Sequence, residues 1–270
     1  MDDWNRIAEY IENNVNVWEQ HDERYEYKSD MNINGIIFDY GGTIDSRGDH
    51  WSEIIFRAYV SEGAETDRDS FRKAYVYAER ALDGSGIITP DDDFLMTMRK
   101  KVSIQFRYLG IDAPSLADAI ATRCYEHARE NVADSREALS TLAERYPLGI
   151  VSNFYGNLRC VLRDFGILHL FRTVVDSTEA GIRKPDPKIF LKAIADMEGC
   201  DMPAAVSAGP KYLVVGDSVK NDIIPADSIG CFTALIPGTP WDADRAQPVI
   251  PDRTVTIHSL QELPEILPEM

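Results

Sequence analysis

Four short segments, far apart in the sequence, each bring a charged or hydroxyl side chain to the end of an apolar run or to a turn. Three of the runs end at Asp39, Ser152 and Asp217, and the fourth segment carries Lys184 directly before Pro185. Short apolar runs that stop at turn residues are typical of the buried strands of a parallel sheet. Since ligands bind beyond the carboxyl ends of such strands, we expect these side chains to meet at one site.

The second half of the chain alternates between apolar strands and helices. After a strand at 33–39, we expect strands at 148–152, 173–176, 212–216 and 232–236, a weak strand at 254–257, and helices at 156–165, 187–198 and 220–230. Strands that alternate with helices in this way form a parallel sheet with helices on both faces. The predicted fold class is therefore α/β, with a doubly wound parallel sheet as its core.

The first two predicted strands are separated by far more sequence than one crossover needs. Asp39 and Ser152 lie 113 positions apart, whereas a strand-helix-strand unit needs roughly 30 residues. A small helical domain is therefore expected between them, followed by a separate return helix at 135–145 that belongs to the core. Its amphipathic stretches lie near 51–62, 67–82, 92–109 and 115–130. The predicted domains are an N-terminal helical extension at 1–32, a core at 33–48 and 132–270, and a helical cap at 49–131.

The extension carries apolar side chains at roughly helical spacing from Trp4 to Trp18, with acidic residues between them. This pattern predicts an amphipathic helix. Packing on the core is its expected role, and contact with a partner helix or a second copy of the chain is the alternative. The oligomeric state is left open by the sequence.

The charge balance argues against nucleic acid as a partner. The 45 acidic and 28 basic residues give a formal charge of −17, whereas binding to a duplex needs a basic surface. The four cysteines form no close pair and have no histidines at zinc-ligand spacing, so reduced thiols in a cytoplasmic protein are expected. No basic stretch with an apolar core opens the sequence, and no apolar run is long enough to cross a bilayer, so no membrane partner is expected.

Asp39 is the candidate nucleophile. It follows the apolar residues 36–38 and precedes a glycine pair, so its carboxylate projects from a strand end with little bulk around it. A carboxylate in that position can attack phosphorus and form an acyl phosphate, which replaces one difficult displacement by two easier ones. Capping of the following turn is the alternative role.

Ser152 and Asn153 end the second predicted strand and are expected to open a helix near Tyr155. A hydroxyl and free backbone N–H groups at a helix start can bind a phosphate. An ordinary helix cap is the alternative, and the two roles are compatible.

Asp217 and Asp222 are candidate metal ligands. Magnesium takes oxygen ligands in octahedral geometry and commonly binds few carboxylates together with water and phosphate. Asp39 with Asp217, helped by Asp222, fits that preference. For Asp222 alone, a carboxylate that interacts with a helix dipole is the alternative.

The four segments resemble, in order and in spacing, the four motifs of the haloacid dehalogenase (HAD) superfamily. Its members are mostly phosphatases that work through an aspartyl-phosphate intermediate, and the resemblance is to the branch with a helical cap between motifs one and two. The resemblance implies Mg²⁺ as the cofactor. The segments are Ile36–Thr43, Leu148–Asn153, Gly181–Pro187, and Leu213–Ser218 with Asn221–Asp222.

The resemblance also implies roles for single residues. In the family, the lysine that matches Lys184 neutralises phosphate charge and orders the nucleophile, for which a compact point charge suffices. Thr43 matches the threonine of the first motif and could donate its hydroxyl or backbone N–H to a phosphate oxygen, with a turn-stabilising hydroxyl as the alternative. Family members that act as dehalogenases generally lack the metal-binding acidic pair and carry a tyrosine in place of Gly41, so that chemistry is disfavoured.

Gly41 is the one departure from the phosphatase pattern. In the family this position is usually a second aspartate, whose backbone carbonyl completes the metal shell and whose carboxylate protonates the leaving group and later activates water. Glycine keeps the carbonyl and loses the acid, which is typically worth about 10²–10⁴ in rate. Substrates with good leaving groups, such as acyl or aryl phosphates, would be affected least. A replacement acid could come from Asp45, Asp49 or His50. For each of them, a solvated residue of the loop is the alternative interpretation.

We therefore predict a magnesium-dependent phosphatase-like hydrolase that acts on a small phosphorylated metabolite through an aspartyl-phosphate, without the usual general acid/base. The alternative is a catalytically degenerate protein of the same fold that binds a phosphometabolite or a protein partner. The predicted site consists of the catalytic residues Asp39 and Lys184, the phosphate-binding residues Thr43, Ser152, Asn153 and Lys184, and the metal ligands Asp39, Gly41, Asp217 and Asp222.

Overall fold

The computed structural model describes residues 33–201, 211–239 and 248–267. The predicted N-terminal helix lies outside the described residues. Within the described ranges, no helix combines the length and the apolar character that crossing a membrane would require.

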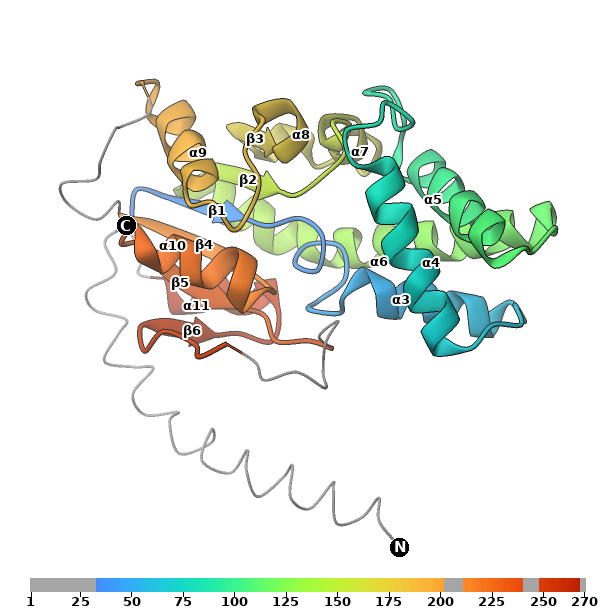
Figure 1. Ribbon diagram of the computed structural model, residues 1–270. Helices are drawn as coiled ribbons and strands as arrows, with labels where there is room; N and C mark the ends of the chain where they lie inside the picture. The colour runs from blue at the N-terminus through green and yellow to red at the C-terminus, as the bar shows by residue number, and fades with distance from the viewer. Residues whose placement is uncertain (1–32, 202–210, 240–247, 268–270) are drawn as a thin grey trace, which may run out of the picture.

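Six parallel strands form one sheet in the order β3-β2-β1-β4-β5-β6 (Figure 1). The predicted parallel sheet is confirmed, and the strands begin and end within two residues of their predicted positions. Their bounds are β1 (Gly35–Phe38), β2 (Leu148–Ser152), β3 (Thr173–Asp176), β4 (Tyr212–Gly216), β5 (Phe232–Leu235) and β6 (Thr254–Thr256).

Alternate side chains of β1 point to opposite faces of the sheet, as the period of two in a strand requires. Ile36 belongs to an apolar cluster that includes Leu139 of α6, whereas Ile37 belongs to a cluster that includes Ile189 and Phe190 of α9. All of these side chains are almost fully buried. Helices therefore cover both faces of β1, which explains why its sequence is continuously apolar.

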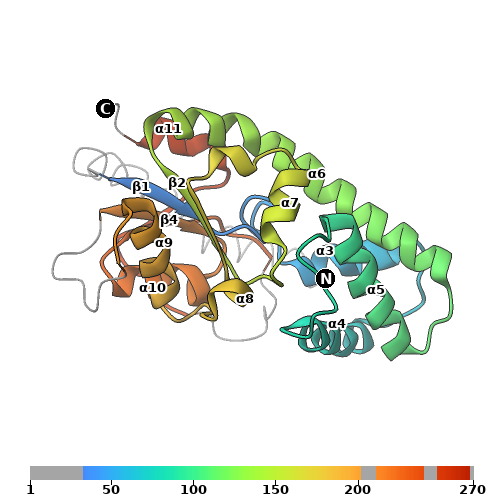
Figure 2. The same ribbon diagram turned by 90° about the horizontal axis from the view of Figure 1, so that it is seen from above.

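Helices surround the sheet and also form an inserted group between β1 and β2 (Figures 1 and 2). Those of the insertion are α3 (Trp51–Ser61), α4 (Arg68–Leu82), α5 (Phe94–Leu109) and the first part of α6 (Pro114–Arg145). The others are α7 (Leu158–Asp164), α8 (Ser177–Ala180), α9 (Lys188–Glu198), α10 (Ile224–Ser228) and α11 (Leu263–Ile266), with the short turns η2 (Leu168–Leu170), η3 (Val219–Ile223) and η4 (Leu260–Glu262).

Helix α6 runs without interruption for 32 residues from the inserted helices to the sheet (Figure 2). The expectation of two helices, at 115–130 and 135–145, was wrong. The intervening residues contain neither glycine nor proline, and the buried positions Ala128, Val132 and Ser135 continue one stripe along the helix. Nothing in the sequence therefore stops the helix. The predicted domain boundary after residue 131 falls inside it.

The sheet order reverses at β1. The chain passes from β1 to β2 on one side of this strand, and later to β4 on its other side. In doubly wound sheets, the crevice at such a reversal is where ligands bind. Asp39 follows β1 and Asp217 follows β4, so both side chains lie at this reversal.

The continuity of α6 can be tested at Ala133, an exposed position near the middle of the helix. Ala133→Pro should reduce the free energy of unfolding by about 3 kcal/mol or more, because proline removes a backbone hydrogen bond and clashes with the preceding turn. Ala133→Gly, the matched control, should reduce it by about 1 kcal/mol. Urea denaturation measures both values, and a proline variant as stable as the wild type would show that two helices meet near this position.

Candidate active site

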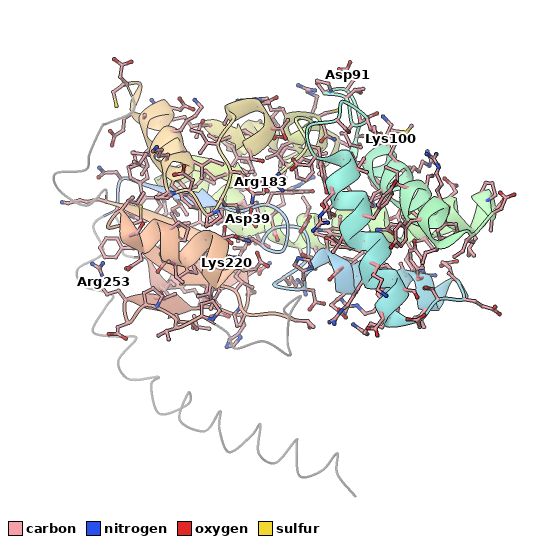
Figure 3. All side chains as sticks on the ribbon, viewed as in Figure 1. Asp39, Asp91, Lys100, Arg183, Lys220 and Arg253 are labelled. Atoms are coloured by element: carbon pink, nitrogen blue, oxygen red, sulfur yellow. The ribbon has the colours of Figure 1, made fainter. Side chains whose placement is uncertain are left out.

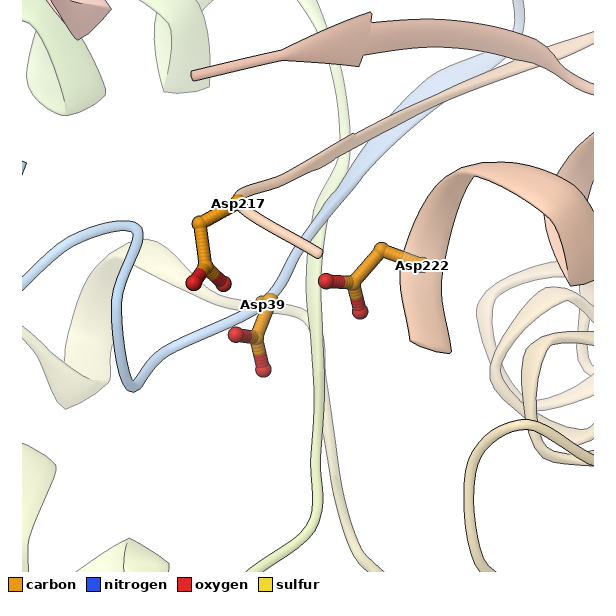
Figure 4. A group of neighbouring side chains, drawn as sticks. All are labelled: Asp39, Asp217 and Asp222. Atoms are coloured by element: carbon orange, nitrogen blue, oxygen red, sulfur yellow. The ribbon is translucent and has the colours of Figure 1, made fainter. Parts of the chain in front are cut away.

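Three carboxylates gather at the reversal of the sheet (Figure 4). Asp39 and Asp222 are almost fully buried, whereas Asp217 is half-buried. Each of the three contributes a carboxylate oxygen to a group whose members lie within 4.8 Å of one another. The residues predicted from two distant segments to hold a metal are therefore close together in the fold.

Two glycines make this close approach possible. Gly42 has a φ of +98°, and a Cβ atom there would lie 2.4 Å from the carboxylate of Asp217. A Cβ atom on Gly216 would lie 2.4 Å from the Cβ atom of Asp222. A larger residue at either position would displace a carboxylate, and at Gly42 it would also strain the backbone.

Lys184 lies between two of the carboxylates. Its Nζ atom donates hydrogen bonds of 2.6 Å to Asp39 Oδ1 and 2.6 Å to Asp222 Oδ1, and its side chain is 4% exposed. Burial alone would lower the pKa of Lys184, but the charges of Asp222 and Asp39 outweigh it and raise the pKa, so the lysine stays charged. The predicted partnership of the lysine with the candidate nucleophile is present in the structure.

The side chain of Asn153 holds the backbone of Lys184. The Lys184 N–H donates to Asn153 Oδ1 at 2.9 Å, and Asn153 Nδ2 donates to the Lys184 carbonyl at 3.1 Å. Ser152 is buried at the end of β2, and both residues line the same cavity as Asp39. Ser152 is thus placed for a ligand in that cavity, while the amide of Asn153 is engaged in positioning the lysine.

The helix after Ser152 begins later than predicted. Helix α7 starts at Leu158 rather than near Tyr155, and its N-terminal region faces another carboxylate. Asp176, at the end of β3, accepts hydrogen bonds from the N–H groups of Gly156 at 2.8 Å and Leu158 at 3.3 Å. We expected these N–H groups to be free to bind a phosphate, but Asp176 already accepts hydrogen bonds from some of them.

Thr43 lies within the loop that follows β1. It is 1% exposed, and its N–H donates to the carbonyl of Tyr40 at 3.3 Å. No group among the described residues hydrogen-bonds to its hydroxyl. The turn is therefore held by the backbone of Thr43 and not by its hydroxyl, and a contact of Thr43 with phosphate stays a prediction.

Asp45 is completely buried, so its interpretation as a solvated loop residue was wrong. Its Oδ1 atom accepts from the N–H of Gly42 at 2.9 Å, and its Oδ2 atom accepts from Trp51 Nε1 at 2.8 Å. Burial raises the pKa of Asp45 to about 7, partly offset by these hydrogen bonds, and the nearby charge of Asp39 adds to the increase. A carboxyl group that titrates near neutrality thus supports the loop that carries Gly41.

The indole of Trp51 borders the position where the family's second aspartate would stand. A Cβ atom on Gly41 would lie 3.7 Å from Trp51 Cδ1 and 3.8 Å from its Nε1 atom, which is ordinary contact. The φ of Gly41 lies outside the left-handed region. The loop could therefore accept a side chain at Gly41 without backbone strain.

The two other candidate acids have structural partners. Asp49 forms an ion pair with Arg57, which contributes to a lowered pKa of Asp49 although burial opposes it. His50 is the N-terminal cap of α3, where its Nδ1 atom accepts from the N–H of Ser52 at 3.1 Å. Of the three candidates, only His50 is among the residues that line the cavity.

A cavity of about 850 Å³ opens above Asp39, between the strand ends and the inserted helices. In Figure 3, Asp39 lies where these two parts of the molecule meet. Core residues from each of the four segments line one part of the cavity, and residues of α4 and α5 line another. The size suits a small-molecule ligand.

The three carboxylates and one ammonium group leave a formal charge of −2 in this buried place. Burial raises the pKa of Asp217 well above its usual value, and the charges of Asp39 and Asp222 raise it further. Burial likewise raises the pKa of Asp222 to about 6, although Lys184 opposes the shift. Carboxylate oxygens that repel one another in this way fit a divalent cation such as magnesium, which would relieve the repulsion.

The sequence analysis did not identify the polar pair Glu79 and Lys101, which lines the cavity from α4 and α5. A signal was present, because Lys101 lies at helical spacing from Phe94, Met98 and Val102 on an otherwise apolar stripe of α5. A charged residue on a buried stripe generally has a charged partner. The identity of that partner requires the fold.

Comparison with known proteins agrees with the geometry. Residues 33–230 match the family model of haloacid dehalogenase-like hydrolases. The chain is 32% identical over 165 residues to haloacid dehalogenase-like hydrolase domain-containing protein 3 of Danio rerio, which covers 59% of this chain and 64% of that protein. It is 29% identical over 130 residues to the pyrimidine 5′-nucleotidase YjjG of Escherichia coli, which covers 48% of this chain and 53% of that protein. The matched region thus spans less than two thirds of each relative.

The fold is also similar to that of YfnB from Bacillus subtilis, whose crystal structure contains magnesium. The TM-score is 0.51 at 19% sequence identity, over 87% of this chain and 98% of that chain. At this identity the likeness concerns the fold alone.

The raised pKa of Asp45 predicts a pH dependence of stability. Because the folded-state pKa of about 7 exceeds the unfolded value of about 3.9, the neutral carboxyl stabilises the fold at low pH. That contribution is lost progressively as the pH rises from about 4 to about 7. Relative to Asp45→Asn, the wild type should therefore lose about 1.4 kcal/mol per pH unit between pH 4 and 7, as measured by urea denaturation without metal. A stability difference that does not change with pH would contradict the assigned protonation.

Proposed function

The chain belongs to the haloacid dehalogenase-like hydrolases, and we propose that it is a magnesium-dependent phosphatase of small phosphorylated metabolites. The observation that carries the proposal is the buried lysine shared by two carboxylates: Lys184 lies 2.6 Å from both Asp39 and Asp222 at the reversal of the sheet. The relative YjjG is named a nucleotidase, which is a phosphatase of small molecules. The proposed reaction proceeds through an aspartyl-phosphate.

In the first step, Asp39 attacks the phosphorus and the ester oxygen leaves with its bonding electrons. Lys184 occupies Asp39 Oδ1, so Oδ2 is the oxygen that remains for attack. In the second step, water attacks the phosphorus of the acyl phosphate, which releases inorganic phosphate and restores the carboxylate. Lys184 and the buried hydroxyl of Ser152 would bind the phosphate oxygens, and Asn153 would keep Lys184 in position.

The carboxylates of Asp39, Asp217 and Asp222 would hold magnesium, together with the backbone carbonyl of Gly41. When bound, the ion would supply positive charge that neutralises the phosphate. The lysine alone supplies one positive charge against a dianionic ester, so the second source of charge has a clear electrostatic role.

Gly41 restricts the substrates that such a site can hydrolyse quickly. No carboxylic acid at that position protonates the ester oxygen as it leaves, so esters of acidic alcohols are favoured over alkyl esters. The same feature supports a second candidate function, a catalytically degenerate protein that binds a phosphometabolite or a protein partner. The two candidates differ in whether any phosphate ester is turned over.

The remaining features of the proposal follow from the charge and the cysteines. We propose a small phosphorylated ligand rather than nucleic acid or a membrane, because the acidic balance of the chain opposes polyanion binding. A cytoplasmic location is proposed on the basis of the four free cysteines. The oligomeric state stays open.

The proposal predicts hydrolysis of aryl and acyl phosphates that depends on magnesium. The wild type should release phosphate from 4-nitrophenyl phosphate and acetyl phosphate, and removal of magnesium with a chelator should stop the reaction. Asp39→Asn should abolish turnover because an amide does not form the acyl phosphate. A thermal melt serves as the control for folding. Activity that survives in Asp39→Asn would point to another nucleophile, and a wild type inactive on both esters would favour the binding protein.

A second prediction concerns Gly41→Asp, which the backbone at this position accepts. If the missing acid limits turnover, the variant should gain up to about 10²–10⁴ in kcat on alkyl phosphates such as glycerol phosphate. The gain on aryl phosphates should be much smaller, because their leaving groups need no proton. Gly41→Asn is the matched control, since it adds nearly the same volume without an acid. Equal rates for the two variants on every alkyl ester would refute the assigned limitation.

A further inference from the structure

The cavity above Asp39 has aromatic side chains on both of its sides. Phe154 and Tyr155 line it next to the strand ends, and Trp51, Tyr75 and Phe94 line it from the inserted helices. The indole of Trp51 lies 5.1 Å from the ring of Phe94, and the rings of Phe154 and Tyr155 lie 5.3 Å apart, measured between centroids. Aromatic walls of this kind favour a flat ring as the ligand.

One wall comes close to the reacting centre. The indole of Trp51 would be in ordinary contact with a side chain on Gly41, at 3.7 Å from its Cβ atom. The family places its proton donor on that residue, next to the leaving oxygen. In this chain the surface there is apolar, which suits an oxygen attached directly to a ring more than a polar alkyl alcohol.

A polar group lies among the aromatic walls. Lys101 Nζ donates to Glu79 Oε1 at 2.6 Å, and the hydroxyl of Tyr155 donates to Glu79 Oε2 at 2.6 Å. The ammonium group of Lys101 also lies over the rings of Tyr75 and Tyr155, at 5.6 and 5.1 Å from their centroids. The ion pair therefore connects α4 and α5 and contacts the core through Tyr155.

The two charges of this pair are exposed to different degrees. The side chain of Lys101 is 5% exposed, whereas that of Glu79 is 29% exposed. Burial alone would raise the pKa of Glu79, but the charge of Lys101 and the hydrogen bonds from Lys101 and Tyr155 outweigh it and lower the pKa. The more accessible group is thus an ionised carboxylate, which accepts hydrogen bonds and donates none.

We propose that the substrate is a phosphate ester of a planar ring that carries an amino or ring N–H donor, with the ring between the aromatic walls and the donor on Glu79. This inference rests on the proposed phosphatase and specifies its substrate class. An aryl or heteroaryl ester also leaves without a proton donor, which agrees with Gly41. Glu79 is a specificity residue, and the ammonium of Lys101 keeps it ionised within the cavity.

Two probes of the same shape test the proposal: 4-aminophenyl phosphate, which carries a donor, and 4-methylphenyl phosphate, which does not. Their leaving groups are phenols of similar acidity, so their intrinsic reactivity is similar. The wild type should prefer the amino ester by about tenfold or more in kcat/KM, the usual worth of one hydrogen bond to a charged group. The difference should lie mainly in KM.

Variants then assign the preference to Glu79. Glu79→Gln should bring the ratio of the two kcat/KM values close to one. The double variant Glu79→Leu with Lys101→Met should do the same, and it leaves no unpaired buried charge that would weaken folding. Asp118→Asn is the matched control, because it breaks the exposed ion pair that Arg99 of α5 makes away from the cavity. This control should keep the tenfold preference.

The outcomes separate this inference from the function on which it rests. Hydrolysis of 4-nitrophenyl phosphate by the wild type, together with equal efficiency on the two matched probes, would overturn the assignment of Glu79 and leave the phosphatase standing. A preference that persists in both Glu79 variants would overturn it as well. A wild type that hydrolyses none of the three esters would overturn the proposed function and this inference with it.

Discussion

Mutual repulsion among three closely spaced carboxylates is the constraint on which the rest of the site depends. Asp39, Asp217 and Asp222 lie within one small volume, and a single ammonium group offsets only part of their charge. Two glycines permit the approach, since a Cβ atom on Gly42 or Gly216 would collide with a carboxylate. The sheet keeps Asp39 and Asp217 together against their repulsion, because β1 and β4 are hydrogen-bonded neighbours whose ends cannot separate. A fold that holds like charges together in this way is suited to recruit cations and to polarise an incoming ligand.

The parts of this molecule that the sequence could predict are those determined by local patterns. The strands follow from apolar runs, and the meeting of Asp39 with Asp217 follows from parallel strands that share an edge. The later start of α7 could not be read in the same way, because it goes with hydrogen bonds from the N–H groups of Gly156 and Leu158 to Asp176, which lies at the end of the following strand. The hydrogen bond to Asp45 from Trp51, which belongs to the first inserted helix, could not be read either. Such contacts between distant segments have no periodic signature.

In the loop after β1, the glycine at position 41 has surroundings that differ from those of an acid-bearing loop. Where the family carries an acid, this chain has glycine, with the edge of an indole beside it and a buried carboxyl beneath it. The carboxyl of Asp45 receives hydrogen bonds from both Gly42 and Trp51, so it connects the glycine loop to the first turn of α3. The loop that carries Gly41 therefore lacks the family's acid but is held firmly in place. Binding of a metal through the backbone carbonyl of Gly41 would require such a loop.

Helix α6 has a mechanical consequence. Its 32 residues span about 48 Å at 1.5 Å per residue, and the same rigid rod is packed against the sheet at one end and against α5 at the other. Many enzymes enclose a ligand by swinging a lid on flexible loops. Here one of the two connections resists such a swing, because rotation would have to bend a helix. We therefore expect the distance between the two walls of the cavity to vary little during turnover. A molecule too thick for that distance would be excluded when it binds, and not by the closure of a lid.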